Sequence, residues 1–165
     1  AGRTDRTAAF FSGPGTVYVF SIHGHDALNV ITATDGHPEG VLVRALEPTD
    51  GVDAMRERRG FDDPAKLASG PGRLTEALGV TRAGYDDRPL ADTTLSLHRT
   101  DWNPDVAVTG RVGVTSAAGW PLRFVAPASD CVSATPPDVD LDPGAVEAAY
   151  ERLHADADLP TVDDA

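Results

Sequence analysis

The densest group of side chains that could carry chemistry is the run His23-Gly24-His25-Asp26. Two histidines two positions apart on a strand would share one face, and imidazole is the commonest metal ligand in proteins. A closed metal site needs about four ligands, and beyond Asp26 the chain offers this run only the distant His37. Metal binding is therefore the weaker interpretation, and we expect neither a metal ion nor a cofactor.

Two Ser-Gly-Pro-Gly segments, at residues 12–15 and 69–72, supply flexible loops. Neither has the spacing of a phosphate-binding loop. The second opens a predicted helix, so Gly70, Gly72 and Arg73 could meet a phosphate at the helix N-terminus. Spacing alone favours an ordinary turn followed by a helix start.

Arg44 places a charge inside an apolar stretch, where an ionised group needs a partner or a ligand. Both an ion pair in the core and a role in a site satisfy that need.

The single cysteine, Cys131, excludes an internal disulfide and a cysteine-rich zinc module. No histidine is near Cys131 in the sequence, so we expect a buried, small apolar side chain.

The elements that must position these residues are mainly short strands. Alternating, β-branched and aromatic residues predict strands at 17–22, 28–32, 41–46, 94–98, 106–108, 111–114 and 122–125. The stretch 41–46 is mostly apolar, so we expect that strand to be central. Capping and spacing predict helices at 51–59 with Asp50 as N-cap, at 71–78 ended by Gly79, and at about 143–154. These elements predict one α+β domain over residues 1–154 and a disordered acidic tail over 155–165.

Length and charge narrow the class of protein. The chain has 165 residues and no apolar run of the roughly 18 residues that a membrane span needs. Its net charge is −12, its acids are mostly Asp, and its bases are nearly all Arg. Such a composition suits a salt-rich prokaryotic cytoplasm, where screening weakens the usual inference that an acidic protein avoids DNA. We expect a cytoplasmic monomer and leave DNA open as a partner.

Four sequence blocks, in order over roughly residues 2–134, resemble the alkyladenine (3-methyladenine) DNA glycosylase family. The first block is PGTVYVF, followed by IHG and LNV. The second is VLVRALEP, followed by a glycine and MR. The third is SGPGRL followed by ALG, and the fourth is RVGV followed by a tryptophan and PLRF. The resemblance implies a curved antiparallel or mixed sheet surrounded by helices. It also implies a DNA repair enzyme that flips an alkylated or deaminated purine out of duplex DNA and hydrolyses its N-glycosidic bond.

The same resemblance implies roles for single residues. Phe20 matches the aromatic residue that stacks on the flipped base, and Leu42 matches a wall of the pocket. Asn29 matches an asparagine whose amide clashes with the 2-amino group of guanine. Arg44 and the backbone of Val112 match positions that hold the attacking water.

Contacts with DNA are also expected, from the resemblance and from the distribution of arginines. His23 matches a tyrosine that fills the gap left by the flipped base, and the segment that follows it is one residue shorter than in the family. We expect some of Arg3, Arg6, Arg44 and Arg73 to form a positive strip beside the pocket, which would make DNA affinity fall with salt.

The family's general base, a glutamate upstream of the segment matched by Gly2-Arg3, has no counterpart in this sequence. Asp26 and Glu47 are the carboxylates closest in sequence to the matched pocket positions, and the resemblance assigns the role to neither. Two explanations follow: N-terminal truncation, or a catalytically inactive module that binds damaged DNA. We favour truncation, because a binding module would not need the water-holding Arg44 or the pocket Asn29. The chain as printed is then not expected to excise bases.

Overall fold

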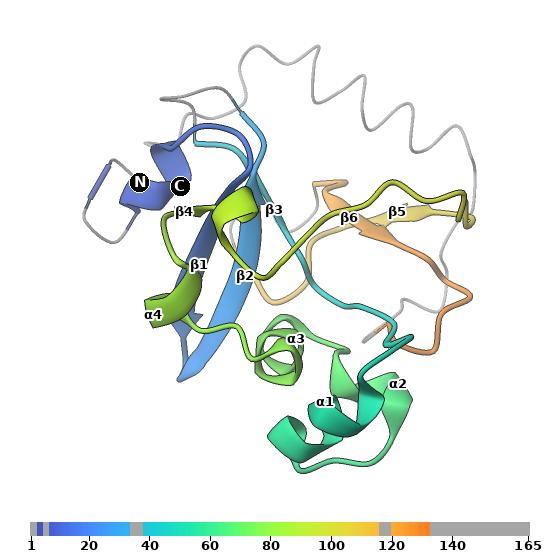
Figure 1. Cartoon of the computed structure of the whole chain (residues 1–165). Coiled ribbons are helices and arrows are strands. Elements are labelled where there is room, and N and C mark those ends of the chain that lie inside the picture. Colours follow the sequence, from blue (N-terminus) through green and yellow to red (C-terminus); the bar gives the residue numbers. More distant parts are fainter. Residues whose placement is uncertain (1–2, 5–6, 34–37, 116–119, 133–165) are drawn as a thin grey trace. The chain divides into compact units, whose positions relative to one another are not determined.

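The computed structural model describes residues 3–4, 7–33, 38–115 and 120–132 (Figure 1). They belong to two compact units, residues 2–99 and residues 100–165 with Ala1. Helices and antiparallel sheets occur together, which confirms the predicted α+β class. No helix among the described residues is long and apolar enough to cross a membrane. The helix predicted at 143–154 and the acidic tail predicted at 155–165 lie outside the described residues.

A four-stranded antiparallel sheet in the order β3-β2-β1-β4 forms the frame of the first unit. Its strands are β1 (Thr16–Ile22), β2 (His25–Ile31), β3 (Gly40–Leu42) and β4 (Arg88–Pro89). A two-residue turn joins β1 to β2, and both its residues have positive φ, 51° at His23 and 81° at Gly24. Positive φ at both central positions is typical of the type I′ turn, whose twist matches that of the paired strands.

The strand predicted at 41–46 is shorter than expected, and it lies at an edge of this sheet instead of its centre. The backbone N–H of Val43 still donates to the carbonyl of Leu28, at 3.0 Å. The N–H of Leu46 instead donates to the carbonyl of Ala68, at 3.2 Å, so the chain has left the sheet by that point. Apolar content alone could not separate an edge strand that turns away from a central one.

Among its described residues, the first unit also contains four helices and two 3-10 turns. They are η1 (Ala8–Phe11), α1 (Val52–Arg59), α2 (Pro64–Leu67), α3 (Pro71–Leu78), α4 (Arg82–Tyr85) and η2 (Leu90–Asp92). The bounds predicted for α3 are confirmed, and Gly79 ends it with φ of 70°. The N-cap predicted for α1 is wrong. Gly51 occupies that position with φ of 65°, and the Asp50 carboxylate accepts a hydrogen bond from the Gly51 N–H.

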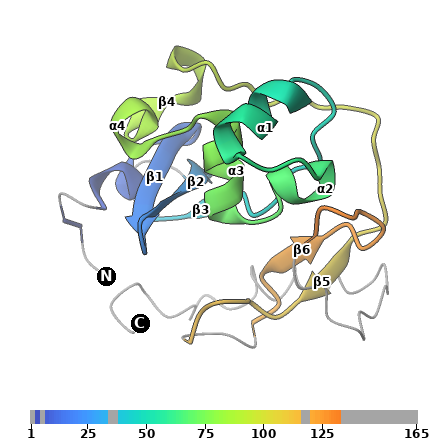
Figure 2. The same ribbon diagram turned by 90° about the horizontal axis from the view of Figure 1, so that it is seen from below.

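Each face of the sheet carries its own apolar cluster. Helices α1, α2 and α3 gather together (Figures 1 and 2), and α3 packs on β2. The first cluster, on the α3 face, buries Val17, Val19, Leu28, Ala68, Leu74, Ala77 and Val80. The second cluster, on the opposite face, buries Ala9, Tyr18 and Ile31, with Phe10 and Phe20 packed against them. Strand alternation explains the division, because successive side chains of β1 point to opposite faces.

In the second unit, β5 (Ala107–Thr109) pairs antiparallel with β6 (Arg123–Val125). These strands confirm two of the predicted ones within a residue or so. Cys131 is buried, as expected. No strand forms at 111–114, where Gly113 has φ of 78°, a value outside extended backbone.

The stretch 94–98 of the first unit is also not a strand. Its alternation has no partner strand among the described residues, and Leu97 is 70% exposed. Alternation indicates a strand only where another strand supplies the hydrogen bonds.

Candidate functional site

The residues matched to the family's base pocket share one face of the four-stranded sheet. The register sets Asn29 of β2 opposite Tyr18 of β1 on one side and opposite Leu42 of β3 on the other. Residues directly opposite in antiparallel strands project to the same face, and residues two apart on one strand do so as well. Phe20, two positions after Tyr18, therefore projects to the same face as Asn29 and Leu42.

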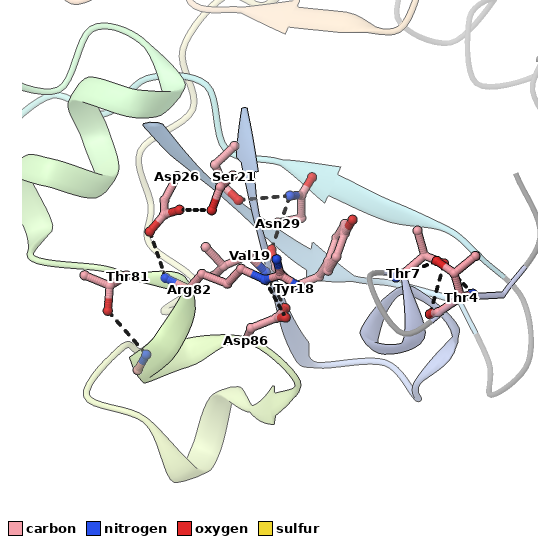
Figure 3. A network of polar contacts seen from close by, with 12 residues as sticks. Thr4, Thr7, Tyr18, Val19, Ser21, Asp26, Asn29, Thr81, Arg82 and Asp86 are labelled. Atoms are coloured by element: carbon pink, nitrogen blue, oxygen red, sulfur yellow. Dashed lines mark hydrogen bonds and ion pairs between the residues drawn. The ribbon is translucent and has the colours of Figure 1, made fainter. Parts of the chain in front are cut away.

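Hydrogen bonds hold the side chain of Asn29 in place on this face of the sheet. Its side chain is buried, and its amide nitrogen Nδ2 donates to the backbone carbonyls of Tyr18, at 3.2 Å, and Ala27, at 3.3 Å (Figure 3). Both neighbouring atoms are acceptors, so the nitrogen and not the oxygen of the amide must face them. With both amide hydrogens engaged, the side chain cannot turn aside without losing buried hydrogen bonds.

Phe20 lies at the end of a row of aromatic rings. Its ring centroid is 5.7 Å from that of Tyr18, which in turn lies 5.3 Å from that of Phe10 on η1. Phe20 is half-buried, so part of its ring stays open to a ligand. Packing against Tyr18 restricts the orientation of that ring. Tyr18 and Phe20 are two positions apart on a predicted strand, and this spacing is a sequence signal that could have indicated that the Tyr18 ring packs against the Phe20 ring.

Arg44 follows the end of β3 and is half-buried. The preceding residue, Val43, packs against the cluster on the α3 face. Alternation in an extended segment places Arg44 on the opposite side, the side of Leu42. Among the described residues Arg44 has no ion pair, so the core ion pair considered above is not found there.

The two histidines of the run 23–26 do not share a strand face, contrary to the metal-site interpretation. His23 occupies the first position of the turn and is exposed, whereas His25 begins β2 and lies against α3. Within the part of the chain that the structure describes, no three His, Cys, Asp or Glu residues gather where they could hold a metal ion.

The other residues predicted to contact DNA or to hold the water molecule belong to different parts of the chain. Arg3 is exposed, and Arg73 on α3 donates to the Oγ of Ser69, at 3.2 Å. Arg6 lies outside the described residues, so the positive strip stays a prediction. Val112 belongs to the second unit, where it is exposed.

Two carboxylates in the first unit have roles that no sequence motif indicated. Asp26 accepts hydrogen bonds from Ser21 and from the backbone N–H of Arg82. Asp86 accepts from the backbone N–H of Val19, at 2.9 Å, beyond the point where β4 stops pairing with β1. The contacts of Asp26 with Arg82 and of Asp86 with Val19 join residues 56 and 67 positions apart, so no local pattern encodes them.

The chain is similar to several known proteins. Residues 1–130 match the model of the family described as Methylpurine-DNA glycosylase (MPG). A protein of Rhodopseudomonas palustris (strain HaA2) named "Putative 3-methyladenine DNA glycosylase" is 44% identical over 124 residues, which cover 74% of this chain and 61% of that protein. A protein of the same name from Methanoculleus marisnigri is 47% identical over 139 residues, which cover 80% of this chain and 71% of that protein.

A third protein of that name, from Koribacter versatilis, is 41% identical over 140 residues, covering 81% of this chain and 67% of that protein. This chain therefore covers less than two thirds, 61%, of the length of the Rhodopseudomonas relative. A family model that matches most of the chain, together with relatives above 40% identity, identifies the family. The chain belongs to the methylpurine-DNA glycosylase family.

Proposed function

We propose that the protein is a DNA repair N-glycosylase of base excision repair, acting as a cytoplasmic monomer. It flips alkylated or deaminated purines out of duplex DNA and hydrolyses the bond between base and sugar. Family membership supports the reaction class. The observation that carries the proposal is that Phe20, Asn29 and Leu42, on three separate strands, project to one face of the sheet.

Each of these side chains has a task that suits its chemistry. An alkylated purine is poor in electrons and stacks well on the π-face of Phe20, whose ring is supported by Tyr18. Leu42 forms an apolar wall. Asn29, fixed by its two hydrogen bonds, occupies space that an added 2-amino group on the base would need.

Hydrolysis requires a water molecule held against the sugar C1′ and a carboxylate that removes its proton. We assign the holding of water to Arg44. Asp26 is a poor choice for the base, because its carboxylate already accepts from Ser21 and Arg82. Neither Asp26 nor Glu47 matches the family's catalytic position, so we assign the role of general base to neither of them.

The test is excision by the product of the complete gene. Duplexes carrying hypoxanthine, ethenoadenine or 7-methylguanine are incubated with excess protein, in low and in molar KCl, beside an undamaged duplex. We expect release of the free damaged base and a strand break at the abasic site after alkali. Preferential binding to damaged duplex without release would support the inactive module instead. Equal binding to both duplexes without release would contradict both functions.

Asn29→Ser is expected to raise the excision of normal guanine, relative to hypoxanthine, about tenfold, which is the usual worth of one steric rejection in a pocket. The smaller side chain would vacate the space that rejects the 2-amino group. The measurement is single-turnover release of each base from otherwise identical duplexes. Asn103→Ser is the matched control, because Asn103 is an exposed asparagine of the second unit. An unchanged ratio in Asn29→Ser would remove the assigned role.

A further inference from the structure

The end of the β1–β2 hairpin projects beyond the strands on either side of it. The hairpin end comprises Ile22, His23, Gly24 and His25, all of them exposed. On one side, β4 pairs only with Thr16 and Val17 of β1. On the other side, β3 pairs with β2 only from Asn29 onward. An isolated two-stranded hairpin is marginally stable in water, so other contacts must hold this end in place.

Asp26 supplies three of those contacts, and Figure 3 shows the ones with Ser21 and Arg82. One carboxylate oxygen accepts from the Ser21 hydroxyl, at 2.5 Å, and so links β2 to β1. The other accepts from the backbone N–H of Arg82, at 2.8 Å, at the start of α4. The backbone carbonyl of Asp26 accepts from Thr75 Oγ1 of α3, at 2.9 Å. One residue beside the turn therefore ties the hairpin to two helices.

One further contact holds the part of β1 that leads to the hairpin end, and another braces the end itself. Asp86, just after α4, accepts from the Val19 N–H of β1 and also lies 3.4 Å from Arg82 Nε. On the β2 side, His25 lies so close to α3 that a Cβ added to Gly72 would sit 2.8 Å from the His25 Cβ. Helix α4 thus lies beside β1 and α3 beside β2 (Figure 1).

We infer that Asp26 is a positioning residue for DNA probing, holding the His23 turn rigid against α3 and α4 so that it can enter the duplex. The inference rests on the proposed function and on the match of His23 to the family's tyrosine that fills the gap left by the flipped base. A wedge must push against stacked bases, and a mobile hairpin would have to be ordered at the moment of flipping. Prior attachment of the hairpin removes that cost from the flipping step.

The test is a double-mutant cycle in the product of the complete gene, read as the single-turnover rate of hypoxanthine release at saturating protein. Asp26→Ala removes both carboxylate contacts, and we expect the rate to fall about tenfold, the usual worth of a lost charge-assisted hydrogen bond. Asp26→Asn keeps the shape, can accept from the Arg82 N–H and can donate to Ser21. We expect it to restore the rate to within about threefold of wild type.

The second arm of the cycle uses His23→Asn, because asparagine tolerates positive φ and keeps the turn while removing the imidazole. In that background we expect Asp26→Ala to change the rate by less than about twofold, since the wedge that it positions is gone. Asp63→Ala is the matched control. It removes a carboxylate contact to the Ala65 N–H, at 3.1 Å, at the start of α2, remote from the hairpin.

Each of the following results would overturn the inference. They are an equal fall in Asp63→Ala, a full tenfold fall from Asp26→Ala in the His23→Asn background, and no rescue by Asp26→Asn. If urea unfolding shows that Asp26→Ala does not fold, Ser21→Ala replaces it. This variant removes the hydrogen bond from Ser21 to the Asp26 carboxylate, leaves the contact between Asp26 and Arg82, and must show the same dependence on His23. A wild-type protein that releases no base refutes the proposed function, and the inference falls with it. Normal release by wild type with an unaffected Asp26→Ala refutes the inference alone.

Discussion

Replacing Arg44 by alanine is expected to lower the single-turnover rate of base excision about 100-fold, because a misplaced water molecule costs a reaction of this kind roughly that factor. Arg44 is half-buried beyond β3, on the side of the sheet that carries Leu42, and it has no ion pair among the described residues. Its guanidinium is therefore available to a water molecule or to DNA. The measurement is hypoxanthine release at saturating protein, where weakened DNA binding no longer affects the rate.

Arg44→Lys separates charge from geometry. Lysine keeps the positive charge but loses the planar set of donors, so we expect it to recover only part of the rate. Arg56→Ala is the control for loss of a partly exposed arginine, since Arg56 pairs with Asp53 on α1, away from the row of pocket residues. A fall of less than about threefold in a folded Arg44→Ala protein would contradict the assignment of Arg44 to the water.

Leu74→Ala is expected to lower the free energy of unfolding by about 3 kcal/mol, the typical result of removing a fully buried leucine side chain. Leu74 is 0% exposed and belongs to the cluster between α3 and the sheet, together with Val17, Val19 and Leu28. A close-packed core cannot refill the space without moving the helix. Urea unfolding followed by circular dichroism measures the change.

Leu97→Ala provides the matched comparison for Leu74→Ala. Leu97 is in the same unit and is 70% exposed, so we expect a change within about 0.5 kcal/mol. A loss below about 1 kcal/mol in Leu74→Ala would show that α3 is not anchored through this cluster. It would also weaken the bracing of the hairpin end, because Thr75, the next residue, donates to the Asp26 carbonyl.

Features encoded by neighbouring residues could be predicted from the sequence. Helix α3 begins at Pro71, which suits the first helical position, and ends at Gly79, which adopts the positive φ that terminates helices. Residue types also predicted strands at 17–22 and 28–32, which correspond to β1 and β2. Four ordered blocks of residues predicted the family, and the comparisons confirm it.

Features that depend on a distant partner were decided only by the tertiary structure. The stretch 41–46 is mostly apolar, yet only Gly40–Leu42 forms a strand, and by Leu46 the backbone bonds to Ala68 instead. The run His23-Gly24-His25 offers two possible metal ligands in sequence, but the type I′ turn separates them. Backbone pairing and turn geometry outweigh the chemistry that side-chain spacing alone suggests.

Asp26 shows most clearly the difference between what the sequence predicts and what the tertiary structure decides. Sequence position made it one of the two carboxylates nearest the matched pocket residues, whereas the fold engages it with Ser21, Thr75 and Arg82. The last two partners lie 49 and 56 residues away. Local preferences determine which segments become strands and helices, because those preferences act between near neighbours. Packing of those segments determines which charges meet, because hydrogen bonds form between whichever groups the fold brings together.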